Sequence, residues 1–452
     1  MQNYMLPIYD ITRKTSRFRV SHILEKTQWL PREEIGRLQQ KNLRALLRHA
    51  YETVPYYRRV FRERKLSPSD VKCVPDLAKL PVLTKALVRE NFSDLVSQTF
   101  SKNDLIPCRS GGTGDQFSFY ITRKQQSWEI AAEFRAYRWA GYRFGDKCVL
   151  FWGSPIDLAK HKSMIKRFSS RLERIAVLNT YVLSEKVLGE YVSLMRRFNP
   201  EIIRGYASSV YLVARYMLEN GVSDVLPKAV ITSAESLLSF QRRTIEKAFG
   251  CKVFDYYGSR EVGAIAAECP EHCGYHISAE NVVVEFVKDS ENVAARESGK
   301  LLITSIQNFG MPLIRYAIGD VGTSTDNVCA CGRGLPLMSS IEGRVSQFMA
   351  VYDRQLGRVV PVSTAAPGPF SMALMQVPLE SYRIVQESLD RVVIKAVKGK
   401  GYLPKHTDFI IAYFRKILGD NIAVEFEFLD YLPPLPSGKR SVFSSRIDSF
   451  EN

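Results

Sequence analysis

Apolar and polar positions alternate along the first part of the chain at spacings typical of helices and strands. From about residue 31 to 60, apolar side chains recur at helical spacing, which predicts a helix that Pro55 ends. A second helical pattern starts near Lys124 and reaches Gly141, where a turn precedes an apolar strand at 148–152. The next predicted elements are a helix at 208–218, a strand at 228–232, a helix at 239–249 and a strand at 252–256. This alternation predicts an α/β fold with sheets covered by helices.

The pattern changes after Gly322. A Cys-rich turn is followed by a strand-like segment at 347–352 and by a passage rich in Gly and Pro that ends at Pro369. The remainder predicts a small α+β unit, with strands at 382–386 and 391–397, a helix at 408–418 and a strand at 422–429. We therefore expect a large N-terminal domain over 1–343, helical at its start over about 30–105, and a small C-terminal domain over 344–452.

The composition is that of a folded protein with more than one domain. The chain has 452 residues, beyond the size at which a single hydrophobic core usually stops growing. Hydrophobic residues make up 45% and charged residues 24%, which is close to average globular usage and excludes a mostly disordered chain. The first residues lack the pattern of a signal peptide, and no window approaches the ~20 apolar residues of a membrane span. We therefore expect a cytoplasmic protein without a transmembrane segment.

The net charge is +16, with 63 Lys and Arg against 47 Asp and Glu. Such a balance favours anionic partners such as nucleotides, coenzyme A, acidic lipid headgroups or nucleic acid. The basic residues are dispersed, and no RNA-recognition or zinc-finger signature is present, so we expect no specific nucleic-acid partner. A solvated basic surface is the simpler interpretation.

A Gly-rich loop is the first motif that could carry chemistry. Residues 109–115 are Arg-Ser-Gly-Gly-Thr-Gly-Asp, a composition that permits close backbone approach and offers hydroxyl and amide groups to phosphate. It is not the P-loop pattern, because no Lys-Ser/Thr pair follows the last Gly. A plain Gly turn therefore stays open as an alternative.

Four further motifs follow in order. They are Asp-Tyr-Tyr-Gly-Ser-Arg-Glu at 255–261, Arg-Tyr-Ala-Ile-Gly-Asp at 315–320, Glu-Gly-Arg at 342–344 and Pro-Ser-Gly-Lys-Arg at 436–440. The first of these ends a predicted strand, where ligand sites of α/β sheets usually lie. Each motif alone could be a turn, an ion pair or a strand end. Their order and spacing along the chain are therefore more informative than any one of them.

In this order, the five motifs resemble the adenylate-forming superfamily of acyl-coenzyme A synthetases, luciferases and peptide-synthetase adenylation domains. The segments 54–58, 80–85 and 232–237 also resemble the phenylacetate-coenzyme A ligase family and its relatives in capsular polysaccharide biosynthesis. The resemblance spans about residues 30 to 446. It implies a large ATP- and acyl-binding domain followed by a small lid domain.

The resemblance also implies roles for individual residues around ATP. The segment Ser110, Gly111, Gly112, Thr113 and Gly114 would wrap the beta and gamma phosphates. Other positions implied to bind the nucleotide are Ala234, Glu235, Asp255 (adenine amino group), Tyr256, Tyr257 (stacking on adenine), Gly258, Ser259, Asp320 (ribose) and Arg344 (ribose or phosphate). Glu261 would hold a magnesium ion, and Lys439 would neutralise charge at the alpha phosphate. Electrostatic stabilisation of this kind is what phosphoryl-type substitution requires.

The sequence departs from the family pattern at several positions. Gly112 stands where many relatives carry Ser or Thr, and 115–116 are Asp-Gln where Pro-Lys is common. The usual hinge Asp after Gly343-Arg344 is missing, which leaves Ser346 or Gln347 as the hinge.

Three functions follow from the resemblance. The protein could activate a carboxylic acid with ATP and transfer the acyl group to coenzyme A. It could instead transfer the acyl group to an amine or hydroxyl, for example on a surface polysaccharide, or it could be a catalytically silent scaffold. The adenylation motifs do not separate the first two, and a homodimer is compatible with each. Candidates for the acyl site are Trp152, Gly153, Gly205 and Tyr206.

Two short segments hold a cluster of potential metal ligands. The first contains Cys269, His272, Cys273 and His276, and the second contains Cys329 and Cys331. Four such ligands suffice for tetrahedral zinc, although reduced cysteines also fill protein cores. The resemblance to family members with a structural zinc implies the set Cys269, His276, Cys329 and Cys331, with His272 and Cys273 as alternates. A closed set of four protein ligands indicates a structural role.

Overall fold

The computed structural model describes most of the chain. The described residues are 10, 15–110, 117–152, 174–180, 185–237, 239–288, 291–342, 348–353, 358–363, 369–374, 376–419, 422–432 and 443–445. Within them, no helix is both long and apolar enough to cross a membrane.

The N-terminal part is helical, as predicted. Its helices are α2 (Arg17–Thr27), α3 (Arg32–Thr53), α4 (Pro55–Glu63) and α5 (Lys85–Glu90), with the 3-10 helices η1 (Pro68–Asp70), η2 (Val74–Lys79) and η3 (Lys102–Asp104). Pro55 ends the first long helix and also begins α4, because the first helical position does not need an amide hydrogen. The expected helix over 31–60 is therefore two helices with the extended residue Val54 between them.

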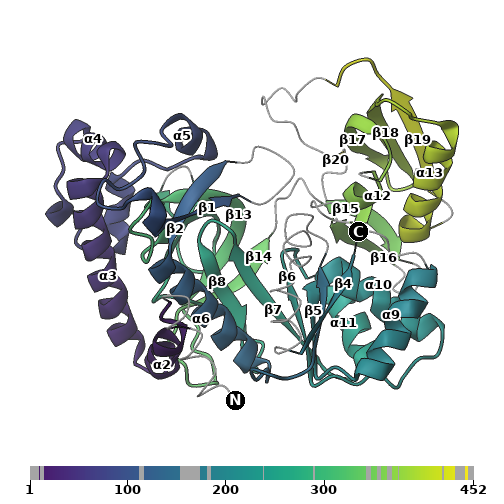
Figure 1. The fold of residues 1–452 in the computed structure, drawn as a ribbon, viewed down its shortest axis with the longest axis horizontal. Helices are drawn as coiled ribbons and strands as arrows, with labels where there is room; N and C mark the ends of the chain where they lie inside the picture. The colour runs from purple at the N-terminus through teal and green to yellow at the C-terminus, as the bar shows by residue number, and fades with distance from the viewer. Residues whose placement is uncertain are drawn as a thin grey trace.

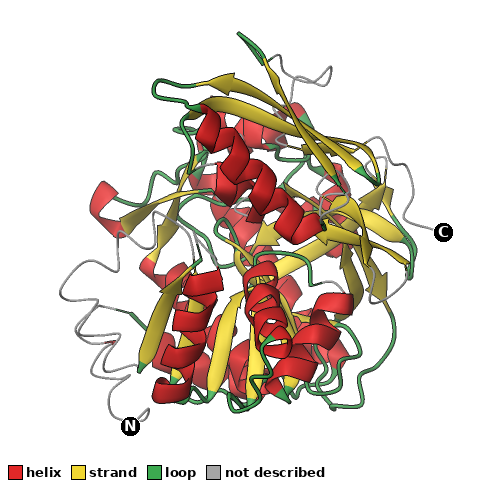
Figure 2. Ribbon diagram, turned by 90° about the vertical axis from the view of Figure 1, so that its right-hand side faces the viewer, coloured by secondary structure: helices red, strands yellow, loops and turns green. Residues whose placement is uncertain are grey.

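A 12-stranded sheet forms the centre of the described structure, and one half of it is parallel. The parallel half is built from β4 (Ile175–Asn179), β3 (Cys148–Trp152), β5 (Ile202–Tyr206), β6 (Ala229–Ser233) and β7 (Lys252–Ser259), in this spatial order. Helices α9 (Glu185–Phe198), α10 (Ala207–Glu219) and α11 (Ser239–Phe249) share one apolar core with these strands, and α6 (Arg123–Trp139) shares another. Figures 1 and 2 show helices on both faces of these strands. The α/β fold is therefore confirmed, and the predicted strand at 148–152 and helix at 239–249 have the predicted bounds.

The other half of the sheet is antiparallel. It continues from β7 through β8 (Gly263–Glu268), β9 (Tyr275–Ile277), β14 (Leu337–Glu342), β13 (Tyr316–Thr325), β12 (Ser298–Ser305), β10 (Val282–Lys288) and β11 (Glu291–Asn292). The hairpin β1 (Leu105–Arg109) and β2 (Ser118–Thr122) lies beside it. Apolar residues of α3, α4, β2, β8, β10, β12 and β13 meet in the largest buried core, which fixes the N-terminal helices on this half.

The C-terminal residues form a smaller α+β unit. Its strands are β15 (Phe348–Asp353) paired with β16 (Arg358–Ser363), and β19 (Ala423–Phe428), β18 (Arg391–Lys398), β17 (Leu379–Ser388) and β20 (Phe443–Ser445) in one four-stranded sheet. Its helices are α12 (Pro369–Leu374) and α13 (Pro404–Leu418). The unit has its own apolar core and lies beside α9 and α10 in Figure 1. The predicted boundary after Gly343 lies outside the described residues and stays a prediction.

Candidate active site and metal site

The carboxyl ends of the parallel strands bring several predicted site residues together. In the strand register, Phe151 is level with Gly205, Tyr206 with Ser233, and Ser233 with Tyr256. Ala234 and Glu235 follow directly after β6. The acyl candidates and the nucleotide candidates therefore share one edge of the sheet, which is where α/β sheets bind ligands.

The turn after β6 has an unusual backbone. Ala234 adopts a φ of 67°, in the left-handed region that residues with a Cβ rarely enter. Such a conformation costs on the order of 1 kcal/mol and is often found at functional sites. This residue is among those that the family resemblance places beside the nucleotide.

Asp255 lies at the centre of a buried hydrogen-bond network. Its carboxylate accepts from the Thr232 hydroxyl at 2.7 Å and from the Tyr275 hydroxyl at 2.9 Å. Its backbone amide donates to Glu268 at 2.8 Å, and Glu268 in turn accepts two hydrogen bonds from Arg242. Burial, together with the charge of Glu268, raises the pKa of Asp255 to about 7. The network fixes the end of β7 against β6 and α11.

Tyr257 and Asp320 are joined directly, although 62 positions separate them in the sequence. The Tyr257 hydroxyl donates to the Asp320 carboxylate at 2.8 Å, which links β7 to β13. Both side chains are half-buried. Two residues with separately implied nucleotide roles thus form one contact. Gly258 follows Tyr257 in β7. It has no room for a side chain, because an added Cβ would lie 2.8 Å from the carbonyl oxygen of Gly263.

Glu261 lies just beyond β7 and is buried. Its carboxylate accepts from the Tyr316 hydroxyl at 3.5 Å. Burial raises the pKa of Glu261, although the backbone amide and the charge of Lys85 act in the opposite direction. A carboxylate oxygen is a ligand that magnesium prefers, so this residue fits the implied metal. Ser259 caps the same turn by accepting from the amide of Val262 at 3.3 Å.

The segment before α5 is tied to the same region through Arg315. Arg315 forms a buried ion pair with Glu285 at 3.1 Å, and its guanidinium donates to the carbonyl oxygen of Leu80 at 2.5 Å. The amide of Leu83 donates to the carbonyl oxygen of Arg315 at 3.0 Å. These contacts place Thr84 and Lys85 next to the start of β13. Sequence reasoning noted both segments but did not predict that they touch.

The Gly-rich segment lies between β1 and β2 in the sequence. Ser110 is buried at its start, where its hydroxyl accepts from the amide of Phe117 at 2.9 Å. Residues 111–116 lie outside the described residues, and so do the implied site residues Gly153, Arg344 and Lys439 and the hinge candidates Ser346 and Gln347. Their roles stay predictions.

The acyl candidates Trp152 and Tyr206 lie together at the ends of β3 and β5. Their rings are stacked, with centroids 4.5 Å apart and an interplanar angle of 17°. Packing explains why position 205 is a glycine, because an added Cβ would lie 2.6 Å from the Cβ of Phe151.

Sequence reasoning did not predict an ion pair close to these strand ends. Arg204 of β5 forms an ion pair with Glu133 of α6 at 3.1 Å and also donates to the Tyr137 hydroxyl. The signal was present in the sequence, since an Arg inside an apolar strand and a Glu inside an apolar helix pattern both require a partner.

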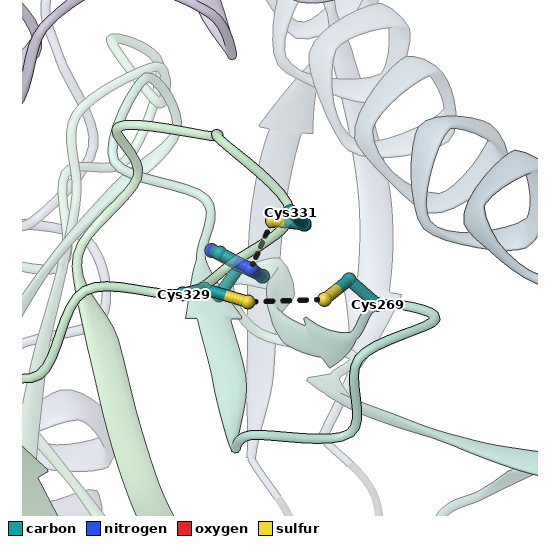
Figure 3. Close-up of side chains that lie close together, drawn as sticks. Cys269, Cys329 and Cys331 are labelled. Atoms are coloured by element: carbon teal, nitrogen blue, oxygen red, sulfur yellow. Dashed lines mark hydrogen bonds between the residues drawn. The ribbon is translucent and has the colours of Figure 1, made fainter.

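The predicted metal ligands lie within a single small cluster. Ligand atoms of Cys269, His276, Cys329 and Cys331 all lie within 4.8 Å of one another. The sulfurs of Cys269 and Cys329 are 3.5 Å apart, and the sulfur of Cys331 is 3.3 Å from Nε2 of His276. Figure 3 shows the three cysteines converging. Tetrahedral zinc with Zn–S bonds of ~2.3 Å requires ligand separations of about 3.5 to 3.8 Å, so the four donors fit zinc.

The two alternate ligands point elsewhere. His272 lies 3.5 Å from a carboxylate oxygen of Glu268, and the exposed Cys273 donates to the carbonyl oxygen of Glu271 at 3.3 Å. Burial lowers the pKa of His276 to about 4, which leaves its ring neutral, as a metal ligand must be.

The cysteine cluster packs against the end of α6 and lies close to the end of α2. The His276 ring packs against Trp139 of α6, with centroids 5.5 Å apart. The side-chain oxygen of Gln28 accepts from both Trp139 and Arg333, at 2.9 and 3.0 Å. The cluster therefore connects three separate parts of the chain.

Comparison with known proteins identifies relatives over the whole chain. No protein-family model matches it. It is 24% identical to protein CapK of Staphylococcus aureus over 445 residues, which cover 97% of this chain and 95% of CapK. It is 26% identical to the phenylacetate-coenzyme A ligase of Thermus thermophilus over 333 residues, which cover 71% of this chain and 73% of the ligase.

A solved structure shares the fold. The structure of 2-hydroxyisobutyryl-CoA ligase in complex with 2-HIB-AMP and CoA matches 93% of this chain and 92% of its own, with a TM-score of 0.64 and 20% sequence identity. These likenesses confirm the resemblance found in the motifs. The chain is similar in sequence to protein CapK and to phenylacetate-coenzyme A ligases, and it has the fold of 2-hydroxyisobutyryl-CoA ligase.

Proposed function

We propose that the protein is an adenylate-forming ligase that activates a carboxylic acid and transfers the acyl group to coenzyme A. The observation that carries the proposal is the contact between Tyr257 and Asp320, because it unites two residues with implied nucleotide roles. Glu261, the implied magnesium ligand, is bonded to Tyr316 of the same strand as Asp320. The phenylacetate-coenzyme A ligase relatives support this enzyme class.

In the first step, the acid carboxylate attacks the alpha phosphorus of ATP. The bond from that phosphorus to the bridging oxygen breaks, and the products are acyl-AMP and pyrophosphate. Tyr257 and Asp320 would hold adenine and ribose, and Asp255, fixed by Thr232 and Tyr275, would face the adenine amino group. Glu261 would hold magnesium, which neutralises phosphate charge when it is bound. Lys439 would act on the alpha phosphate.

In the second step, a thiol attacks the acyl carbon, AMP leaves, and the thiol proton is released to solvent. We propose that residues 344–452 act as a lid that carries Lys439 and closes over the N-terminal domain. The separate apolar core of the C-terminal unit supports such a rigid body. The basic balance of the chain suits the phosphates of coenzyme A.

A second candidate differs only in the acceptor. Protein CapK resembles this chain along almost all of its length. The resemblance of the sequence motifs to ligase relatives in capsular polysaccharide biosynthesis also suggests a role in surface polysaccharide synthesis. We therefore keep an amine or a sugar hydroxyl as the alternative acceptor. The cytoplasmic location and a homodimer stay expectations.

We also propose that Cys269, His276, Cys329 and Cys331 bind a structural zinc ion. The proposal is supported by the separations of the four donors and by their closed set. The ion would fix the segment after β8 to the segment after β13.

The test of the main proposal is a search for acyl-AMP by mass spectrometry after incubation with ATP, magnesium and panels of aryl, fatty and amino acids. Coenzyme A and then amines would be added to any mixture that forms the adenylate. Acyl-AMP followed by a thioester is the expected result. Acyl-AMP that coenzyme A does not consume but an amine does would favour the second candidate.

A further inference from the structure

A polar cluster lies between α6 and the ends of the parallel strands, on the face that carries the acyl candidates. We call it the α6 cluster and define it by its members, which are Gln125, Glu129, Glu133, Arg204 and Tyr256. Arg204 and Tyr206 are two positions apart in β5 and therefore point to the same face of the sheet. The ring of Tyr256 lies 5.6 Å from that of Tyr137, one turn after Glu133 in α6. The cluster thus lies on the Tyr206 face of the sheet.

The charges in this cluster do not balance. Glu133 is paired with Arg204 at 3.1 Å and accepts from the Tyr137 hydroxyl. Glu129 accepts only from the side-chain amide of Gln125, at 2.7 Å, and no cation pairs with it among the described residues. Burial raises the pKa of Glu129 to about 8, and the charge of Glu133 adds to this rise, while the hydrogen bond from Gln125 acts in the opposite direction.

The side-chain oxygen of Gln125, in the same cluster, has no donor among the described residues. The side chain of Gln125 is 1% exposed, and its Oε1 has no hydrogen-bond partner within the described part of the chain. A buried acceptor without a donor costs roughly 1–3 kcal/mol. Gln125 and Glu129 are adjacent on one face of α6, so a buried amide oxygen without a donor lies beside a carboxyl group that no cation pairs with among the described residues.

The position of Glu129 connects it to the proposed active site. Gly263 follows the turn that carries Glu261, and an added Cβ there would lie 2.2 Å from Cγ of Glu129. Gly263 also has a φ of 73°, which Gly adopts without strain. The glycine makes room for Glu129 directly against this turn.

We propose that the acid used by this enzyme carries a hydrogen-bond-donating substituent, an amine or a hydroxyl, that Glu129 and Gln125 receive. The inference rests on the proposed adenylate-forming function and names the substrate class of the same site. A purely apolar acid would leave the Oε1 of Gln125 without a donor and the carboxyl group of Glu129 with Gln125 as its sole partner among the described residues. A donor on the substrate would satisfy them, and a cationic amine would also favour the ionised carboxylate.

The test uses matched acids. Acid-dependent exchange of pyrophosphate into ATP is measured with aryl and aliphatic acids that bear an amino, a hydroxyl or, as the isosteric control, a methyl group. We expect kcat/KM to be at least tenfold higher for an amine or hydroxyl acid than for its methyl partner, because sites built for a hydrogen bond reject analogues that lack it.

Two variants test whether Glu129 causes this preference for a polar substituent. Glu129→Leu should reduce the preference to less than threefold, and Glu129→Gln should lose the preference for the amine while it retains that for the hydroxyl. Glu190→Gln, an exposed position on α9, is the matched control and should keep both preferences. Melting temperatures verify that each variant is folded.

The possible results distinguish a failure of the substrate inference from a failure of the proposed adenylate-forming function. Exchange that is as fast with methyl acids as with their polar partners, or a preference that Glu129→Leu leaves unchanged, overturns the inference and leaves the proposed function standing. Exchange with no acid of the panel overturns the proposed function and this inference together.

Discussion

The proposed nucleotide site and the cysteine cluster lie at opposite ends of the same strands. Glu261 lies two positions before β8, and Cys269 directly follows that strand. Asp320 lies within β13, and Cys329 follows its end. Two strands therefore connect a region of carboxylates and hydroxyls to a region of thiols and imidazole.

The two ends differ in what their side chains can do. At the nucleotide end, Tyr257 and Asp320 are half-buried and hydrogen-bonded to each other, which leaves them accessible to a ligand. At the other end, Cys269 and His276 are fully buried, and the four donors form a closed set. From this difference we expect the first end to bind the substrates and the second to hold the strands in place.

Loss of a cluster ligand should have the largest effect on stability. In Cys329→Ser, bound zinc should disappear, and the free energy of unfolding should fall by about 3 kcal/mol or more, as is usual when a structural metal site is lost. Metal analysis of the purified protein and urea unfolding would measure both. Cys273→Ser, which changes an exposed cysteine outside the cluster, should match the wild type. A wild type that is free of zinc and equal in stability to Cys329→Ser would contradict the structural role.

Removal of one hydroxyl at the other end should affect activity without affecting stability. Tyr257→Phe loses the hydrogen bond to Asp320, and the rate of acyl-AMP formation should fall about tenfold, which corresponds to ~1.4 kcal/mol. Tyr191→Phe, which removes a hydroxyl bonded to the carbonyl oxygen of Asn179 at 2.6 Å, is the matched control. If Tyr257→Phe instead lowered the melting temperature and left the rate intact, the Tyr257–Asp320 contact would be structural.

The smallest effect should come from pH. Because the pKa of Asp255 is raised to about 7 in the folded state, ionisation opposes folding, and its contribution to stability is lost as pH rises from about 4 through 7. The melting temperature of Asp255→Asn, relative to that of the wild type, should therefore increase between pH 5 and pH 8 by about 1–3 °C. A difference that is constant over this range would place the Asp255 pKa near its ordinary value.

The sequence predicted the parallel half of the sheet better than the antiparallel half. Strands such as 148–152 are short apolar runs between helical patterns, so each is delimited by its neighbours. Strands of the antiparallel half follow each other without helices, and the long pairing of β10, β12 and β13 was not predicted. Pairing over such distances depends on tertiary packing, which local periodicity does not contain.

The same limit applies to the site. Asp255, Tyr257, Glu261 and Asp320 were predicted from motif order, and so was the composition of the cysteine cluster. Their partners were not, because Thr232, Tyr275 and Lys85 come from other segments, and a motif does not tell which residue of another segment its side chains contact. The pair Arg204–Glu133 was missed for the same reason, although each residue is a polar position within an apolar element.

The central claim, formation of an acyl-AMP, is tested most directly by acid-dependent exchange of labelled pyrophosphate into ATP in the wild type and in Lys439→Ala. The account predicts exchange with at least one acid of a broad panel and a loss of at least about 100-fold in the variant, because Lys439 would stabilise charge at the alpha phosphate. Absence of exchange with every acid, or exchange that Lys439→Ala leaves unchanged, would contradict it.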